Sequence, residues 1–238
     1  MKDSINVYWT SDLNTTAAAA NQKPPRPVKL SEWKGESFMY CPSLRDHCKN
    51  VFAVDSRVSI NPILHGSTMD FWMPEEQEHL GSYCPQGYGF EGDNRKRYAF
   101  SLQHLIYLTT DCNDLEIEIV HPFMTDSIYS NQCEVVPGQF NLGKYSRSIS
   151  LSFQLRDSNI ETLDIKEGDA LYYIRFKTDK KINFIPFYPE EHIMDLFNNT
   201  NNSSVLGSRT LAKHYDNYKR FNTKKVLLKR IRNQLNEG

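Results

Sequence analysis

This chain lacks long apolar runs, and it lacks the cysteine pattern that stabilises small extracellular domains. No apolar segment approaches the roughly 20 residues that a membrane-spanning helix needs. The first residues, MKDSINVYWTSD, do not have the basic and then apolar pattern of a signal peptide. The five cysteines are odd in number, irregularly spaced and without a C-x-x-C pair, which argues against a disulfide framework. We therefore expect a cytoplasmic protein that does not bind a membrane.

The common catalytic signatures are also missing. The sequence contains no P-loop, no G-x-S-x-G nucleophile motif and no H-E-x-x-H zinc motif. Residues 87–92, GYGFEG, do match G-x-G-x-x-G, but a dinucleotide site needs this motif between a strand and a helix. No helical pattern follows it here, so a glycine-rich hairpin is the better interpretation. The sequence thus assigns no catalytic residue and no cofactor, and it favours a non-enzymatic protein.

The histidines leave one enzymatic alternative open. Some jelly-roll oxygenases hold Fe(II) with two histidines and one carboxylate. Their usual H-x-D/E pair on one strand is absent, and the best remaining ligands are His104, His121 and Asp126. Residues 41–48, CPSLRDHC, bring two cysteines and a histidine together, but structural zinc sites prefer the shorter C-x-x-C spacing. A metal-dependent jelly-roll enzyme is therefore the first alternative.

Short segments with the alternating pattern of β-strands run through most of the chain. In LEIEIV, Leu115, Ile117 and Ile119 alternate with glutamates, as in a strand with one buried face. Residues 147–155, RSISLSFQL, alternate apolar side chains with serine and glutamine in the same way. Many short strands with turns between them and little helix predict a mainly β fold, an antiparallel β-sandwich of jelly-roll type.

The strongest pattern lies in residues 164–187, DIKEGDALYYIRFKTDKKINFIPF. Gly168 supplies the backbone freedom for a tight turn. The following ALYYIRF has large apolar side chains on both faces, which predicts a central strand covered on both sides. We expect TDKK to turn the chain back into INFIPF, so that the two strands form a hairpin. This hairpin builds the core and contains no catalytic group.

The chain reads as one domain in three parts. Residues 1–30 are predicted to form an N-terminal strand and an arm in which three prolines exclude a regular helix. Residues 31–190 form the β-sandwich core. Residues 191–238 change to apolar spacings of three and four residues, which indicate helix. We expect this helical segment to pack on the core.

Charge is spread unevenly along the chain. Residues 205–238 contain nine Lys or Arg against two acidic residues, a net charge of +7, whereas the rest of the chain carries -8. The basic segment can dock on the acidic body, or it can bind an acidic partner or nucleic acid. The predicted partner-binding residues are Lys219, Arg220, Lys225, Lys229 and Arg232.

Nucleic-acid binding would need further features around these cations. On a helix, Lys225, Lys229 and Arg232 share one exposed face, opposite part of the apolar stripe. Base stacking would require exposed aromatic rings beside them. We expect Tyr218 and Phe221 to be buried, which weakens this alternative.

Several segments resemble one protein family. Proteins encoded by marine T4-like phages, including cyanophages, are similar to the run FNLGKYSRSISLSFQLRD followed by LDIKEGDALYYIRFKTDKKINFIPF. The same family, itself uncharacterised, resembles VYWTSD, FMYCPSLRDHCKNVFAVDS and LAKHYDNYKRFNTKKVLLKRI in this chain. A broader family of bacterial and phage β-proteins is more distantly similar to YCPQGYGFEGD and the hairpin. The resemblance implies a phage source and a β-rich fold, and it assigns no activity to any residue.

These features together predict a phage-encoded, non-enzymatic interaction protein. It would act in the cytoplasm of the infected host cell or as a minor component of the virion. We expect a protein partner in the host or the virion. Nucleic acid bound through the basic C-terminal helix is the second alternative, after the metal-dependent enzyme.

Overall fold

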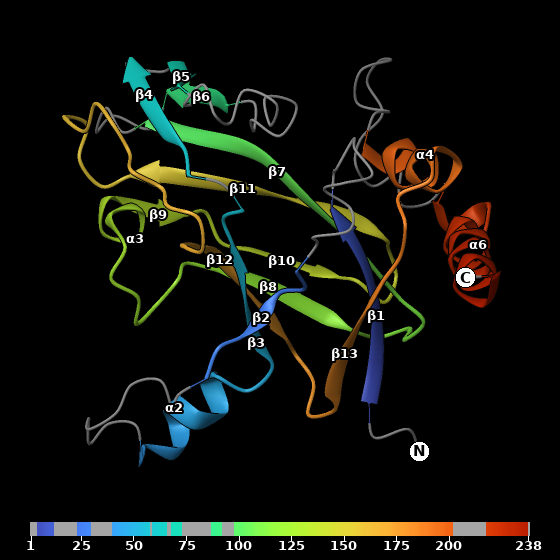
Figure 1. Cartoon of the computed structure of the whole chain (residues 1–238). Helices are drawn as coiled ribbons and strands as arrows, with labels where there is room; N and C mark the ends of the chain where they lie inside the picture. The colour runs from blue at the N-terminus through green and yellow to red at the C-terminus, as the bar shows by residue number, and fades with distance from the viewer. Residues whose placement is uncertain are drawn as a thin grey trace.

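The chain folds into two larger β-sheets, a two-stranded ribbon and several helices (Figure 1). The predicted mainly β fold is confirmed, and so is the C-terminal helix. The computed structural model describes residues 4–11, 23–29, 40–57, 59–65, 68–72, 87–91, 98–201 and 218–237. Among these residues, no helix is both long and apolar enough to cross a membrane.

The first sheet contains one parallel pair of strands. In order across the sheet its strands are β13 (Lys181–Pro186), β1 (Ser4–Ser11), β7 (Tyr98–Thr110), β11 (Arg147–Leu155) and β9 (Cys133–Val135), with β6 (Gly87–Glu91) also paired to β7. The pairs that involve β6, β7, β9 and β11 are antiparallel. β1 and β13 run parallel, with Ser4 opposite Lys181 and Trp9 opposite Pro186. The N-terminal strand is therefore inserted between two strands from much later in the chain.

The second sheet is antiparallel throughout its described pairs. Its order is β10 (Gly138–Asn141), β8 (Glu116–Val120), β12 (Ala170–Phe176), β3 (Val51–Asp55) and β2 (Arg26–Pro27). β12 has a strand on each side and buried residues on both faces, so the predicted central strand is confirmed. A register shift between Ala170 and Tyr172 lets both Leu171 and Tyr172 enter the main core, while Tyr173 packs on the opposite face.

The predicted hairpin of residues 164–187 is wrong. β12 belongs to the second sheet, whereas the next strand, β13, pairs with β1 in the first. The carboxamide of Asn50 donates to the carbonyls of Thr178 (2.6 Å) and Lys180 (3.0 Å) and so fixes the turn between the two sheets. The apolar pattern identified both strands, but such a pattern does not say which neighbour a strand pairs with.

Both sheets contribute to one hydrophobic core. The largest fully buried side chains include Trp9 and Phe153 from the first sheet and Tyr172 and Phe176 from the second. Phe184 of β13 lies edge-on to Phe52 of β3, with ring centroids 5.0 Å apart. Burying a large apolar side chain contributes about 1.5–3 kcal/mol before entropy is subtracted. Aromatic packing between the sheets is therefore a main source of stability.

A second core joins the first sheet to the C-terminal helices. Strands β1 and β7 supply Tyr8 and Tyr107 on the face opposite Trp9. The helices α4 (Glu191–Asn201) and α6 (Thr223–Glu237) supply Phe197 and Leu227, among others, and Figure 1 shows both helices beside this sheet.

The remaining described elements are short. They are the ribbon strands β4 (Asn61–His65) and β5 (Thr68–Trp72) and the helices α2 (Pro42–His47) and α3 (Ile128–Gln132). A capping box between Ser127 and Ser130 begins α3. The free edge of β4 is covered by the segment that leads to β12, through bridges at Ile60–Ile165 and Ile63–Thr162.

Candidate interaction surface

Residues 218–237 are fixed to the body mainly by apolar side chains. Leu227, Leu228 and Ile231 are buried, and each contributes about 1.5–3 kcal/mol. The hydroxyl of Tyr218 donates to Ser146 Oγ (2.6 Å) and accepts from Ser146 N (3.2 Å). Burial raises the pKa of Tyr218 to about 12, so this hydroxyl keeps its proton and its role as donor at neutral pH.

One lysine of α6 also points inward. The ammonium of Lys224 donates to the carbonyl oxygen of Cys112 (3.1 Å) and to that of Gly143. Burial lowers the pKa of Lys224, and the nearby Asp111 carboxylate opposes that change. Lys224 thus caps a loop of the body with its charge and is not available to a partner.

Two arginines of α6 bind the body at its surface. Arg232 pairs with Asp111 (3.0 Å) and donates to the hydroxyl of Tyr8 (3.4 Å), while Arg230 donates to the carbonyl of His192 (3.0 Å). A half-exposed ion pair contributes only about 0.2–1 kcal/mol, so these contacts orient the helix more than they hold it. Part of the basic charge therefore docks on the body, as one of the two interpretations expected.

The other cations of this segment remain outside. Lys219, Arg220, Lys225 and Lys229 are exposed, and no carboxylate of the described residues forms an ion pair with them. Lys225 and Lys229 lie one turn apart on α6. Of the five predicted partner-binding residues, Arg232 alone has a side-chain bond to the described residues of the body.

An exposed aromatic ring lies among these cations. Phe221 is 68% exposed, and the guanidinium carbon of Arg220 is 6.0 Å from its ring centroid. The expectation that Phe221 is buried is therefore wrong, whereas the burial of Tyr218 is confirmed. We call Lys219, Arg220, Phe221, Lys225 and Lys229 the Phe221 patch.

A backbone turn explains why the two aromatic residues point in opposite directions. Asn222 adopts φ 51°, the left-handed conformation that ends a helical turn. It interrupts the helical period between Tyr218 and α6, so that Tyr218 faces the body and Phe221 faces solvent. The asparagine after Phe221 was the one signal in the sequence that could have indicated this outcome.

The candidate metal ligands have other partners where their side chains are described. His121 Nδ1 accepts from the backbone N–H of Val135 (3.2 Å), and burial together with Arg156 lowers its pKa. Asp126 is exposed and accepts from Asn131 (3.1 Å). His104 lies in β7, but its side chain is outside the described part. Among the described residues, no three His, Cys, Asp or Glu side chains gather where they could hold a metal ion.

Segment 41–48, considered above as a zinc site, contacts an arginine of β12. His47 Nδ1 lies 2.8 Å from Arg175 Nη1, and because a guanidinium can only donate, this nitrogen must accept. Arg175 also pairs with Glu118. Of the two cysteines at the ends of the segment, Cys48 is buried and Cys41 is exposed. The sequence could not show the pairing with Arg175, because the two residues are far apart in the chain.

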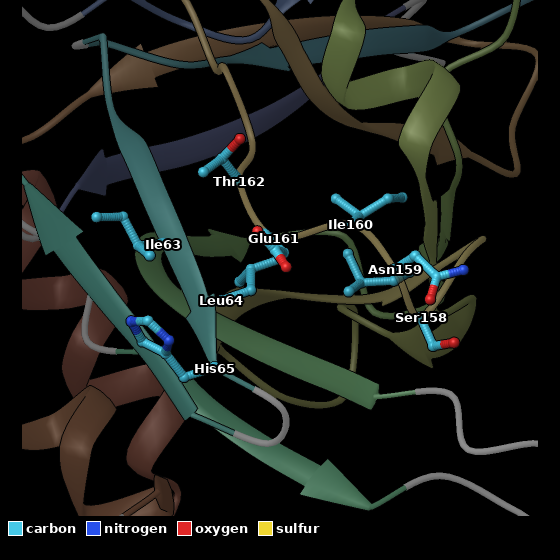
Figure 2. A pocket seen from close by; sticks show the side chains of 9 residues that line it. Ile63, Leu64, His65, Ser158, Asn159, Ile160, Glu161 and Thr162 are labelled. Carbon is cyan, nitrogen blue, oxygen red and sulfur yellow. The ribbon is translucent and has the colours of Figure 1, made fainter.

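A hollow of about 460 Å³ lies between β4 and the loop 158–162. Figure 2 shows Glu161 close to Leu64 and His65 further along β4. The backbone N–H of Leu64 donates to the carbonyl of Glu161 (2.7 Å), which joins two segments far apart in the sequence. Both His65 and Glu161 are exposed, so a ligand held by their charges would remain largely in water.

The interior is less uniformly apolar than the sequence predicts. The hydroxyls of Tyr129 and Tyr172 and the indole N–H of Trp9 are buried without a hydrogen-bond partner in the described structure. Arg57, which is half-buried, donates to Ser11 Oγ (2.5 Å), and this burial lowers its pKa. These groups reduce the stability that the core would otherwise provide.

Two buried tyrosines allow a matched test of this cost. Tyr218→Phe should lower the free energy of unfolding by about 0.5–1.5 kcal/mol, because the backbone N–H of Ser146 loses its acceptor and Ser146 Oγ keeps only Thr109 as a partner. Tyr172→Phe should leave it unchanged or raise it by up to about 1–3 kcal/mol, because that hydroxyl has no partner to lose. Urea unfolding of both variants measures the difference. A loss in Tyr172→Phe as large as in Tyr218→Phe would contradict the assignment.

No protein family, curated protein or solved structure matches this chain.

Proposed function

We propose that this chain is a phage-encoded, non-enzymatic interaction protein that binds its partner through the Phe221 patch. It acts in the cytoplasm of the infected host cell or as a minor virion component. The phage source rests on the sequence resemblance. The binding role rests on one observation: a largely exposed phenylalanine lies among four cations that have no ionic partner in the described structure.

The contrast within one short segment supports this role. Lys224, Arg230 and Arg232 bind the body, and Tyr218 is buried, so this segment has the contacts it needs for docking. No hydrogen bond or ion pair joins a side chain of the Phe221 patch to the described residues of the body. Exposed aromatic rings and arginines are enriched at the centres of binding surfaces, where water is excluded on binding. The partner must carry negative charge to complement the cations.

We also propose that the two sheets face each other as a sandwich of jelly-roll type. The shared core supports this arrangement, as does the contact of Phe184 with rings on both β3 and β12. The parallel pair of β1 and β13 departs from the antiparallel jelly roll. The two facing sheets form the sandwich, and the N-terminal strand β1 is added to the first sheet through its parallel pairing with β13.

Quantitative pull-down from infected cells, together with analysis of purified virions, tests the binding role. The patch variant combines Phe221→Ala with Lys219→Gln, Lys225→Gln and Lys229→Gln. A control variant removes three exposed lysines elsewhere on the body, Lys166→Gln, Lys180→Gln and Lys181→Gln. We expect the wild-type and control proteins to retain the same partner, or the same place in the virion, and the patch variant to lose it. Equal recovery by all three proteins, or no partner and no virion association, would refute the proposal.

A further inference from the structure

We infer that the partner of the Phe221 patch is a single-stranded nucleic acid, with one base stacked on the Phe221 ring and backbone phosphates bound by the surrounding cations. This inference rests on the proposed function and names the chemistry of the partner. Proteins that bind single strands combine cations that follow the backbone with aromatic rings on which bases stack. The patch has both components in the same short segment.

Hydrogen bonds fix the backbone that carries the ring. The N–H of Asn222 donates to the carbonyl of Lys219 (3.2 Å), and the Asn222 carbonyl accepts from the N–H of Lys225 (2.9 Å). Phe221 therefore sits on a hydrogen-bonded turn between a docked helical turn and a long helix. Because this backbone is already ordered, stacking of a base on the ring does not have to order it, which lowers the entropy cost of binding. Arg220 lies beside the same ring and can extend the stacking platform.

Cations lie on both sides of the ring along the chain. Lys219 and Arg220 precede it, and Lys225 and Lys229 follow on α6, about 6 Å apart along the helix axis. Helix α6 begins at Thr223, so the positive end of its dipole adds to the positive electrostatic potential next to Phe221. A single-stranded nucleic acid with one base on the ring therefore has cations near the phosphates before and after that base.

The aromatic ring favours a single strand over the alternatives. A duplex keeps its bases paired and stacked, so it could use the lysines but not Phe221. An acidic protein surface would complement the cations, but it has no general requirement for a ring with an exposed face. A nucleic acid without secondary structure uses every component of the patch.

Fluorescence anisotropy with the full chain and a labelled oligothymidine of about 20 nucleotides tests this inference. Affinity should fall as salt rises, with a slope of about -0.7 in log–log form for each phosphate that the protein contacts. Phe221→Ala should weaken binding by about 5- to 150-fold at every salt concentration without changing the slope. Lys225→Gln combined with Lys229→Gln should reduce the slope by about 1.4. Ring and cations therefore give separate readouts.

Two further variants serve as controls. Tyr40→Ala removes another aromatic side chain that is 82% exposed, outside the patch, and should bind like the wild type. Phe221→Trp keeps a stacking ring and should retain binding, with tryptophan fluorescence that changes on addition of the oligonucleotide. Because Phe221 is exposed, none of these variants at position 221 should alter the circular dichroism spectrum.

The outcomes separate this inference from the proposed function. Wild-type affinity in Phe221→Ala, no binding at low salt, or equal binding of a duplex of the same length would overturn the nucleic-acid assignment. If one of these results is found and the patch variant nevertheless loses its partner in the pull-down from infected cells, the proposed function stands and the partner is an acidic protein. If oligothymidine binds with the expected dependence on Phe221, the inference holds.

Discussion

Replacing Phe176 with alanine is expected to lower the free energy of unfolding by about 3–5 kcal/mol. Phe176 lies on β12 and is fully buried. Its ring meets those of Phe52 (5.7 Å between centroids) and Phe184 (5.8 Å), which come from β3 and β13. The substitution removes contacts within the second sheet and between the two sheets at once, and the close-packed interior can refill only part of the cavity.

Urea unfolding monitored by circular dichroism measures this loss. Phe221→Ala is the matched control, because it makes the same chemical change at a ring that is largely exposed. It should change stability by no more than about 0.5 kcal/mol. Comparable losses in the two variants would contradict either the burial of Phe176 or the exposure of Phe221. The same pair separates stability from binding, since only Phe221→Ala should weaken the interaction of the patch.

Replacing Gly143 with alanine should lower the free energy of unfolding by about 1–3 kcal/mol, the range found when an extra atom is forced into a well-packed site. A Cβ atom at Gly143 would lie 2.5 Å from the carbonyl oxygen of Asn113 and 2.5 Å from the backbone nitrogen of Asp114. Both contacts are backbone atoms, which cannot rotate away as a flexible side chain could. The N–H of Gly143 also donates to the Leu115 carbonyl (3.1 Å), so the loop cannot move aside without losing that bond.

This substitution should also loosen the C-terminal helix. Lys224 donates to the carbonyl of Gly143, so a shift of the loop moves the acceptor of this half-buried ammonium. Gly138→Ala is the control: no atom lies within 4 Å of its added Cβ, and its stability should stay within about 0.5 kcal/mol of the wild type. Thermal unfolding measures stability, and limited proteolysis near α6 measures the docking. Unchanged values in Gly143→Ala would show that the loop adapts.

The sequence left open which cations of the C-terminal segment contact the body and which remain exposed. Their position on the helix decides this. A helix with a buried face places some of its cations at the edge of that face, where they reach the body. Lys224 and Arg232 occupy such edges and find carbonyl and carboxylate oxygens. Lys225 and Lys229 are exposed, and within the described part of the chain no side-chain or carbonyl oxygen pairs with them. Docking of this segment on the body is thus compatible with the partner binding that we propose.

The sequence by itself determined several of the longer strands and which of their faces are buried. Alternation has the period of the extended backbone, so Ile117 is buried and Glu116 exposed in β8, as expected. The apolar residues on both faces of residues 170–176 likewise predicted the central position of β12. These properties depend on neighbouring residues, which the sequence lists directly.

Only the tertiary structure decided which strands pair and which charged or aromatic groups remain outside. β13 pairs with β1 in the other sheet, although the sequence suggested a hairpin with β12. Phe221 faces solvent because of the backbone turn at Asn222, and Lys224 faces inward because two carbonyls lie within its reach. Hydrophobic patterns specify that a face is covered without specifying what covers it. Pairing and exposure depend on residues far apart in the chain, which meet only after folding.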